Sequence, residues 1–284
     1  MLNDFLREVY ATHRLNLSTR TLKQYDLAAQ NFERWAGRAL TVRDFSDELL
    51  LSFMRHLLDE GLSATTVNNY RKYLLLLWNF AYKRRLVDHS ARDVPKLREQ
   101  KRVPNSWTIS EMAQLADACR QAPTIKTWTG QHWLGLVLTL YDSGLRVGCL
   151  MNAKATHFDC RRETLFIPAE NSKGRNDEEK RLHPDTAKLL SRICGTKKLF
   201  DWPFHVCQLQ SFYRRDVLKP AGMPHGRRDL FHKIRRTSYT LVYKTLGLRA
   251  ASDFASHTCD LSAYYLDRSQ LNDAHPLSAL PRPA

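Results

Sequence analysis

The first hundred residues carry apolar side chains at helical spacing. A run from Leu2 to about Ala36 predicts helix, with Ser18 as a cap before its second part. A further helix is expected from Asp44 to Leu57, closed by Gly61. Ser63 then begins a longer helix, whose apolar positions step by three and four residues: Val67, Tyr70, Leu74, Leu77, Trp78 and Ala81. Because no strand pattern interrupts them, these helices predict a small all-α domain.

The helical pattern stops between Ala91 and Ser106. This stretch contains two prolines, many charges and few apolar residues, which is typical of a linker. We therefore expect an N-terminal domain over residues 1–98, a linker over residues 99–106 and a second domain over residues 107–284.

The second domain begins with helical signals and continues into a hairpin. Thr108 and Glu111 form a capping box for a helix that runs to about Arg120, and an apolar helix is expected from Trp128 to Tyr141. Residues 162–168 alternate as a strand, and residues 180–184 start the return after a turn. Helices are expected again over residues 185–193 and 209–217. The fold class is therefore mainly α, with an all-α first domain and an α+β second domain that contains a small antiparallel sheet.

The helix predicted after Asp229 carries the most suggestive polar residues. Asp229 is the expected N-cap and Gly247 the expected stop, with a mostly apolar stripe between them. His232 and Arg235 are three residues apart and so share one face of this helix. A histidine and an arginine on a rigid helix form a suitable clamp for an anionic oxygen.

Charge narrows the class of partner. The net charge is +15, and both the part before Ser106 and the part after it have an excess of basic residues. This favours a polyanion as the partner, because binding of lysine and arginine to phosphates is stabilised by the release of counterions.

Apolar runs are too short for a membrane span, and the start of the chain lacks a signal-peptide pattern. The six cysteines form no CxxC pair, so we expect no zinc site and no disulfide framework, which fits a reducing cytoplasm. We also expect no metal or other cofactor and a nucleoid-associated location.

Four short motifs resemble the tyrosine recombinases, the phage-integrase family. They are Ser-Gly-Leu-Arg ending at Arg146, His-Lys-Ile-Arg-Arg from His232, Ser-His-Thr-Cys-Asp-Leu-Ser-Ala-Tyr-Tyr-Leu-Asp from Ser256, and Leu-Ser-Ala-Thr-Thr from Leu62. The resemblance implies a catalytic set that occurs here in the family's order: Arg146, Lys173, His232, Arg235, His257 and Tyr265. Lys180 competes with Lys173 for the role of the hairpin lysine.

The chain departs from the family pattern at several positions. Cys149 stands where the family usually has an acidic residue, Arg236 where a histidine commonly follows the second arginine, and Ala255-Ser256 where Leu-Gly is common. Tyr265 lies eight residues after His257, where the family has nine, and Tyr264 is the alternative nucleophile.

The resemblance also implies a function and partners. The implied function is site-specific strand exchange on double-stranded DNA through a 3′-phosphotyrosyl intermediate, without metal or ATP. The implied assembly is a homotetramer on paired sites. Accessory DNA-bending proteins are possible partners, no membrane is involved, and the segment after Tyr265 docks on a neighbouring protomer. Two alternatives are a type IB topoisomerase and a degenerate protein that only binds DNA. The expected DNA-contacting residues are Ser63, Thr65, Asn68, Arg71, Lys72, Arg175 and Arg236.

Overall fold

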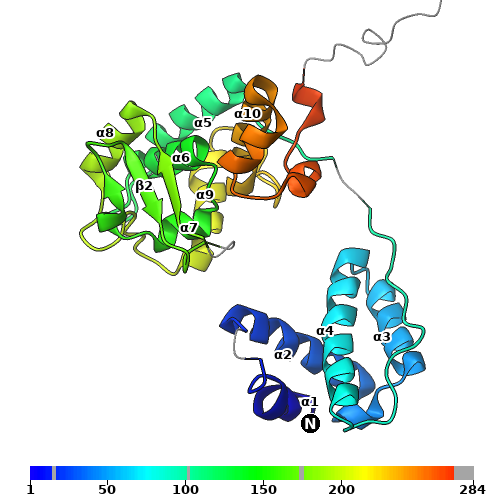
Figure 1. Ribbon diagram of the computed structural model, residues 1–284. Helices are drawn as coiled ribbons and strands as arrows, with labels where there is room; N and C mark the ends of the chain where they lie inside the picture. The colour runs from blue at the N-terminus through cyan, green and yellow to red at the C-terminus, as the bar shows by residue number, and fades with distance from the viewer. Residues whose placement is uncertain (15–16, 101–102, 173–175, 272–284) are drawn as a thin grey trace, which may run out of the picture. The chain divides into compact units, whose positions relative to one another are not determined.

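The chain folds into two units, Met1–Arg102 and Val103–Ala284, each with its own apolar core (Figure 1). The computed structural model describes residues 1–14, 17–100, 103–172 and 176–271. The first unit is all helical in its described residues and the second is mainly helical with one small sheet. The predicted fold class is thereby confirmed. No helix in the described ranges has the length and apolar character needed to cross a membrane.

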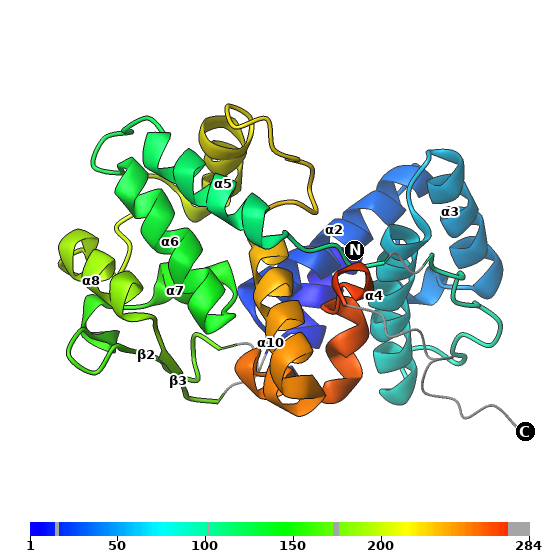
Figure 2. The same ribbon diagram turned by 90° about the horizontal axis from the view of Figure 1, so that it is seen from above.

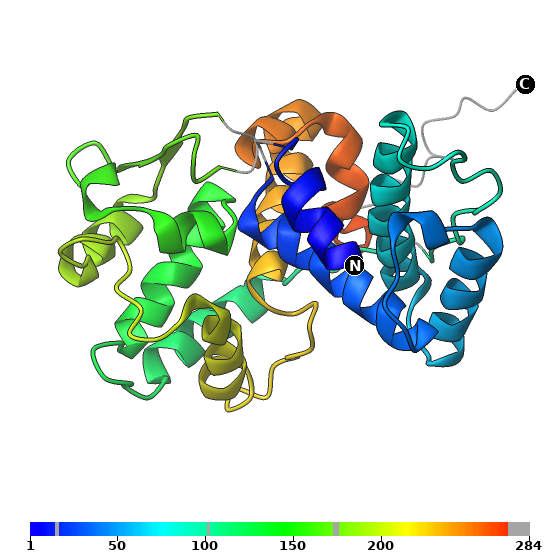
Figure 3. The same ribbon diagram turned by 90° about the horizontal axis from the view of Figure 1, so that it is seen from below.

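The N-terminal unit is a bundle of helices around α2 and α4. Its elements are α1 (Leu2–Asp4), η1 (Phe5–Tyr10), α2 (Thr19–Ala36), η2 (Val42–Asp44), α3 (Asp47–Asp59) and α4 (Ala64–Lys83). The N-terminal turns lie against α2 (Figure 3). As expected, Ser18 caps the second helical part of this stretch, because its hydroxyl accepts a hydrogen bond from the backbone N–H of Thr21.

Two other boundaries in this unit depend on side-chain caps. Helix α3 begins at Asp47 rather than Asp44, because the hydroxyl of Ser46 accepts from the N–H of Leu49. Asp44 instead closes a short 3₁₀ turn by accepting from Thr41. Helix α4 begins after Ser63, as predicted, and Gly61 takes the left-handed conformation that ends the preceding turn.

The first part of the predicted linker region packs on α4. Val94 is buried and Leu97 lies against the same core. Asn68 donates to the carbonyl of Leu97 at 2.9 Å and accepts from its N–H at 2.9 Å, and Arg71 donates to the carbonyl of Val94. Both apolar residues lie within the stretch of linker-like composition at residues 91–106, but inside the expected N-terminal domain of residues 1–98.

The C-terminal unit surrounds one apolar helix. Its elements in chain order are α5 (Ile109–Gln121), α6 (Gly130–Ser143), α7 (Val147–Asn152), η3 (Ala155–His157), β1 (Phe158–Asp159), β2 (Thr164–Ile167), β3 (Glu178–Arg181), α8 (Pro184–Ile193), η4 (Val206–Gln208), α9 (Leu209–Tyr213), η5 (Arg214–Leu218), α10 (Phe231–Phe254), η6 (Cys259–Tyr264) and η7 (Arg268–Gln270). Helix α6 packs against α5, α8 and α10 (Figure 2). The strands pair antiparallel in the order β1-β2-β3.

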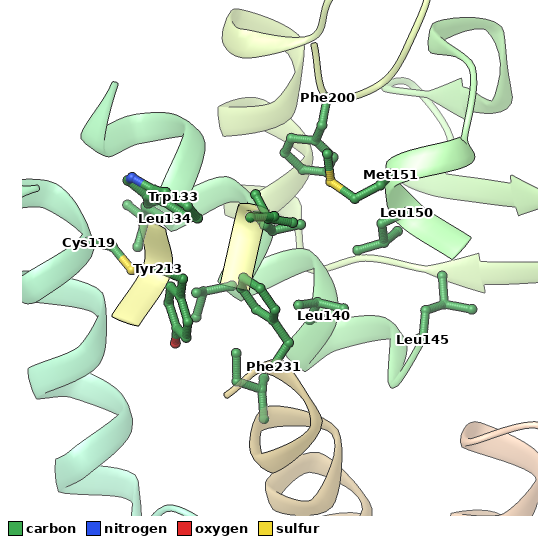
Figure 4. Close-up of a cluster of buried hydrophobic side chains, with 14 of the residues drawn as sticks. Cys119, Trp133, Leu134, Leu140, Leu145, Leu150, Met151, Phe200, Tyr213 and Phe231 are labelled. Atoms are coloured by element: carbon green, nitrogen blue, oxygen red, sulfur yellow. The ribbon is translucent and has the colours of Figure 1, made fainter. Parts of the chain in front are cut away.

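Large aromatic side chains fill the core beside α6 (Figure 4). Trp133 on α6, Tyr213 on α9 and Phe231 at the start of α10 are all buried, and the rings of Tyr213 and Phe231 stack with centroids 4.3 Å apart. Aromatic side chains bury large apolar areas, so this cluster holds the start of α10 firmly in the unit.

Helix α10 differs from its prediction at both ends. Its N-cap is Leu230, while Asp229 accepts from the N–H of Gly226 and from the ammonium of Lys233. Gly247 (φ 82°, ψ −178°) breaks the helical geometry, but a second helical segment continues to Phe254. Nor is there a single apolar stripe, since residues 233–240 are all buried. The first half of α10 is therefore a central helix, which explains how it can carry buried polar groups.

Candidate active site

The turn after α6 presents Arg146. Gly144 has φ 61°, and a Cβ atom at this position would lie 2.5 Å from the ring of Phe254. Glycine is therefore needed for both the left-handed backbone and the close approach. Two residues later, Arg146 caps α7 with its side chain half-buried. The Ser-Gly-Leu-Arg motif thus has a structural reason for its glycine.

Arg235 projects from the buried half of α10 toward the same turn. It is 2% exposed, and its guanidinium donates to the carbonyl oxygens of Gly144 and Ala255. Burial, and then the charge of Arg146 among other groups, lowers the pKa of Arg235. Because two backbone carbonyls hold the fork, Arg235 is fixed in place before any ligand arrives.

Both arginines reach Tyr265. Nη2 of Arg146 lies 3.5 Å from the Tyr265 hydroxyl oxygen, at the limit of a hydrogen bond. The guanidinium carbon of Arg235 lies 5.0 Å from the centroid of the Tyr265 ring. Tyr265 is 6% exposed, whereas Tyr264 is 70% exposed. The structure therefore brings Tyr265, and not Tyr264, to the pair of arginines.

The two histidines complete the surroundings of Tyr265. The ring of His257 stacks on that of Tyr265 with centroids 4.6 Å apart, and the ring of His232 lies 5.4 Å away. Between His257 and Tyr265 the chain forms the 3₁₀ turns of η6. The two rings are in contact although Tyr265 follows His257 by eight residues along the chain, so this spacing is compatible with a site that contains both.

His257 has one ring nitrogen engaged and one available. Its Nδ1 pairs with the carbonyl oxygen of Thr258 at 2.8 Å, which implies that Nδ1 carries the proton. Its Nε2 is buried and has no hydrogen-bond partner among the described residues. Burial and the charges of Arg235 and Arg146 lower the pKa of His257, against the bond to Thr258. A buried ring nitrogen without a partner beside two guanidinium groups is available to a bound ligand.

His232 is neutral at physiological pH. Loss of hydration against the surrounding protein, and then the charges of Arg235, Arg236 and Arg146, lower the pKa of His232 to about 4. Part of the side chain nevertheless faces solvent. A neutral imidazole can accept a proton as well as donate one, which a cation cannot.

The pKa of His232 predicts how stability depends on pH. The unfolded chain binds a proton on this histidine below pH 6.5 and the folded chain only near pH 4, so protonation favours unfolding as pH falls through that window. We expect the His232→Gln variant to lose less stability than the wild type between pH 7 and pH 5. Urea unfolding of both proteins at the two pH values measures this difference, and equal losses would contradict the prediction.

The hairpin lysine predicted from the resemblance, Lys173, lies outside the described residues, as does Arg175. Its competitor Lys180 is described and lies on β3. The Lys180 ammonium donates to the carbonyl of Phe254 and the hydroxyl of Ser256, both at 2.7 Å, and pairs with Glu178 at 3.4 Å. Burial lowers the pKa of Lys180, while Glu178 acts in the opposite direction. Lys180 is thus engaged by three groups of its own chain.

The expected DNA-contacting residues fall into two groups. Ser63, Thr65 and Lys72 are exposed on α4 or at its start. Asn68 and Arg71 hold the segment at Val94–Leu97, and Arg236 is 5% exposed with its guanidinium donating to the carbonyl of Arg228. Each residue of this second set is therefore held by bonds within the chain, while Nε of Arg236 is buried and has no hydrogen-bond partner among the described residues.

Asp267 was not among the predicted site residues, yet it anchors the backbone just after Tyr265. It is 3% exposed, and one of its carboxylate oxygens accepts from the N–H and the hydroxyl of Ser106, at 2.6 and 2.9 Å. The other accepts from the N–H and hydroxyl of Ser269. Burial raises the pKa of Asp267, but these bonds outweigh burial, so the pKa lies below its usual value. The Tyr-Leu-Asp sequence gave no sign of a partner 161 residues earlier.

Removing the Asp267 carboxylate should destabilise the C-terminal unit. In Asp267→Ala, buried donors of Ser106 lose their acceptor, and we expect a loss of about 2–4 kcal/mol of unfolding free energy. Urea unfolding followed by tryptophan fluorescence measures the loss. The exposed Asp253, changed to Ala, is the matched control and should change stability by less than about 0.5 kcal/mol. Equal effects of the two substitutions would show that the Ser106 contact has no special weight.

No group of three or more histidine, cysteine, aspartate or glutamate side chains in the described ranges is arranged to hold a metal ion. The polar groups that gather around Tyr265 are instead cations and imidazoles, which suit an anionic ligand.

The comparisons with known proteins agree with this fold. Residues 1–95 match the family model described as a phage integrase SAM-like domain. A putative tyrosine recombinase XerC from Pseudomonas aeruginosa is 25% identical over 174 residues, which cover 56% of this chain and 40% of that relative. The chain thus spans less than half the length of the curated relative that it matches.

Solved structures extend the likeness over nearly the whole chain. A lambda integrase dimer bound to a COC′ core site matches with a TM-score of 0.73 at 20% identity, covering 94% of this chain and 96% of that one. The Tn1549 transposon integrase in complex with circular intermediate DNA matches with a TM-score of 0.73 at 13% identity, covering 99% of this chain and 100% of that one.

At these identities the structural matches establish an integrase-type fold. Together with the SAM-like domain and the XerC relative, they agree with the resemblance to the tyrosine recombinases seen in the sequence motifs. The relatives named here are recombinases and integrases, so the comparisons favour neither the topoisomerase nor the degenerate DNA-binding protein.

Proposed function

We propose that this protein is a site-specific recombinase that cuts and rejoins duplex DNA through a 3′-phosphotyrosyl intermediate, with Tyr265 as the nucleophile. The observation that carries the proposal is the approach of Arg146 and Arg235 to one buried tyrosine. A free phenol has a pKa of about 10 and is a weak nucleophile. The two guanidinium groups beside Tyr265 bind the phosphate that it attacks and so hold that phosphate close to the hydroxyl.

The roles follow from what phosphoryl transfer needs. Arg146 and Arg235 bind the non-bridging oxygens of the scissile phosphate, for which the planar guanidinium is well suited. His257 offers Nε2 to the same phosphate, in the tautomer or charge state that donates, and His232 passes protons. Tyr265 attacks phosphorus, and the 5′ oxygen leaves with a proton from Lys173. Lys180 is a poorer candidate for this acid, because three groups of the chain hold its ammonium.

The reaction then needs no ATP and no metal ion. The phosphotyrosyl bond replaces the phosphodiester bond that was cut, so its energy is kept for rejoining to another strand. The guanidinium groups supply the positive charge that a metal ion supplies in other phosphoryl-transfer sites. Activity in excess chelator, after prior dialysis against it, is the expected behaviour.

The N-terminal unit would bind the duplex around the site of cleavage. Its SAM-like domain and the exposed Ser63, Thr65 and Lys72 on α4 support this assignment. We propose that four protomers assemble on two paired sites. Among the solved relatives are a lambda integrase dimer bound to a COC′ core site and a tetramer bound to a Holliday junction, which supports DNA-bound oligomers here.

A nicked suicide duplex tests the proposal, because the cleaved end diffuses away and traps the covalent complex. Duplexes made from the genomic flanks of the gene are the candidate substrates. The expected result is a protein–DNA adduct that survives denaturation and disappears on protease treatment. Supercoiled plasmids with and without paired sites provide the second arm, since a recombinase acts on the paired sites and a topoisomerase relaxes both plasmids. Relaxation of both, or no adduct on any flank, would overturn the proposal.

A further inference from the structure

A buried polar cluster joins the β2–β3 hairpin to the turn that precedes His257. The carboxylate of Glu178 accepts from the hydroxyl of Ser172 at 2.7 Å and from the hydroxyl of Ser256 at 2.5 Å. The Lys180 ammonium lies 3.4 Å from the same carboxylate and donates to Ser256. The side chains of Glu178 and Lys180 are only 13% and 11% exposed. A carboxylate and an ammonium in such a place need all these partners to offset their lost hydration.

Ser256 adopts a backbone conformation that serine rarely takes. Its φ is +49°, in the left-handed region that favours glycine. The hydroxyl explains why a serine is present nevertheless, since it donates to Glu178 and accepts from Lys180. Residue 256 therefore links the turn to the hairpin through its side chain, which a glycine cannot do.

The same turn sets the geometry of the phosphate-binding groups. The carbonyl of Ala255 accepts from Arg235, and the carbonyl of Phe254 accepts from Lys180. His257 follows directly, and its N–H donates to the carbonyl of Ser252. A shift of residues 254–256 would thus move both the guanidinium of Arg235 and the ring that stacks on Tyr265.

Position 149 supplies no negative charge near the two arginines. Cys149 is buried, and burial raises the pKa of its thiol above the ordinary value, so the thiol is neutral. Ser256, whose hydroxyl donates to Glu178, directly follows Ala255, whose carbonyl accepts from Arg235, so the turn brings the Glu178 carboxylate close to the arginine pocket. Glu178 is therefore a buried carboxylate that can balance the arginine pair from the hairpin side.

We propose that Glu178 is the positioning residue and counter-charge of the arginine pocket, acting on Arg235 by charge and on His257 through Ser256. This inference rests on the proposed function, because it concerns the same reaction. The proposed role also accounts for the acidic run Asp177-Glu178-Glu179. The side chain of Glu178 is mostly buried, whereas Asp177 and Glu179 are exposed.

Single-turnover adduct formation on the suicide duplex, at saturating protein, tests the role. We expect Glu178→Gln to lower this rate about 10- to 100-fold with duplex affinity unchanged, since a misplaced catalytic group costs rate rather than binding. The adjacent exposed Glu179, changed to Gln, is the matched control and should react like the wild type. A Glu178→Gln rate within twofold of the control would overturn the inference.

A carboxylate placed at position 149 instead of position 178 distinguishes two explanations of the Glu178 effect: charge balance at the arginines and stability of the hairpin. Adding Cys149→Asp to Glu178→Gln should recover at least about tenfold of the lost rate, whereas Cys149→Asp alone should not accelerate the wild type. A merely structural Glu178 predicts no rescue, and a double variant as slow as Glu178→Gln would count against the counter-charge. If Glu178→Gln does not fold, Ser256→Ala is the second variant, because it keeps the carboxylate and removes the hydroxyl that joins Glu178 to the turn. Its rate of adduct formation should fall while its duplex affinity stays unchanged. An unchanged rate in Ser256→Ala would overturn the inference.

The two proposals fail in different ways. A wild-type protein that forms no adduct removes the proposed function itself. A wild-type adduct together with an unaffected Glu178→Gln variant removes only the role of Glu178.

Discussion

Tyr265→Phe is expected to abolish covalent adduct formation on the suicide duplex, a loss of at least about 10⁴-fold. Phenylalanine keeps the ring that stacks on His257 and packs against Arg235, and it removes only the hydroxyl beside Arg146. Folding should therefore be nearly unchanged, and so should DNA affinity. The assay compares adduct yield, measured by denaturing gel, with duplex binding measured in the same preparation.

Tyr264→Phe is the matched control for this experiment. Its ring is 70% exposed and one residue away, so we expect an adduct yield within about twofold of the wild type. An adduct that persists in Tyr265→Phe and is lost in Tyr264→Phe would assign the nucleophile to the other tyrosine. Peptide mapping of the wild-type adduct gives the same answer without a substitution.

Arg146→Lys and Arg235→Lys should each lower the rate of adduct formation about 10²- to 10³-fold. A lysine keeps the charge but loses the planar fork that can hold two phosphate oxygens at once. The two variants should differ in stability. Arg235 is 2% exposed and binds two backbone carbonyls, so its replacement should also cost about 2–4 kcal/mol of unfolding free energy. Arg146 is half-buried and should cost much less.

Single-turnover kinetics and urea unfolding of both lysine variants check these expectations. The informative comparison is Arg146→Lys, because its fold should be intact. If that variant reacts at the wild-type rate, Arg146 does not bind the reacting phosphate, and the close approach of its guanidinium to Tyr265 must have another cause.

Local signals predicted well those parts of the fold that neighbouring residues determine. Ser63 and the Thr108–Glu111 pair cap the helices that they were expected to cap, because a cap depends on residues within one turn. Asp229 failed as a cap for a related reason: its carboxylate is used by Gly226 and Lys233, and the sequence offered no means to rank these partners. Gly247 breaks α10 as expected, yet the chain resumes a helix because Ala251 and Ala255 are buried beyond it.

The candidate site shows the same division. The order of Arg146, His232, Arg235, His257 and Tyr265 could be read from motifs, and the structure gathers all five around one ring. Glu178 and Asp267 could not be found in this way. Each acts on residues between 78 and 161 positions away, through side-chain bonds that leave no periodic pattern in the chain. Their discovery needed the folded geometry.

The anchoring of Asp267 has a consequence for how protomers share their work. Its carboxylate binds Ser106, near the start of the C-terminal unit, and so fixes the backbone that follows Tyr265. Leu266, which precedes Asp267 in the chain, is also buried. If the proposed assembly forms, we expect these bonds to hold each tyrosine in its own subunit, so that each subunit cleaves the strand that its own arginines bind. Any exchange of C-terminal segments between neighbours that leaves these bonds intact has to branch off after Ser269, beyond the nucleophile.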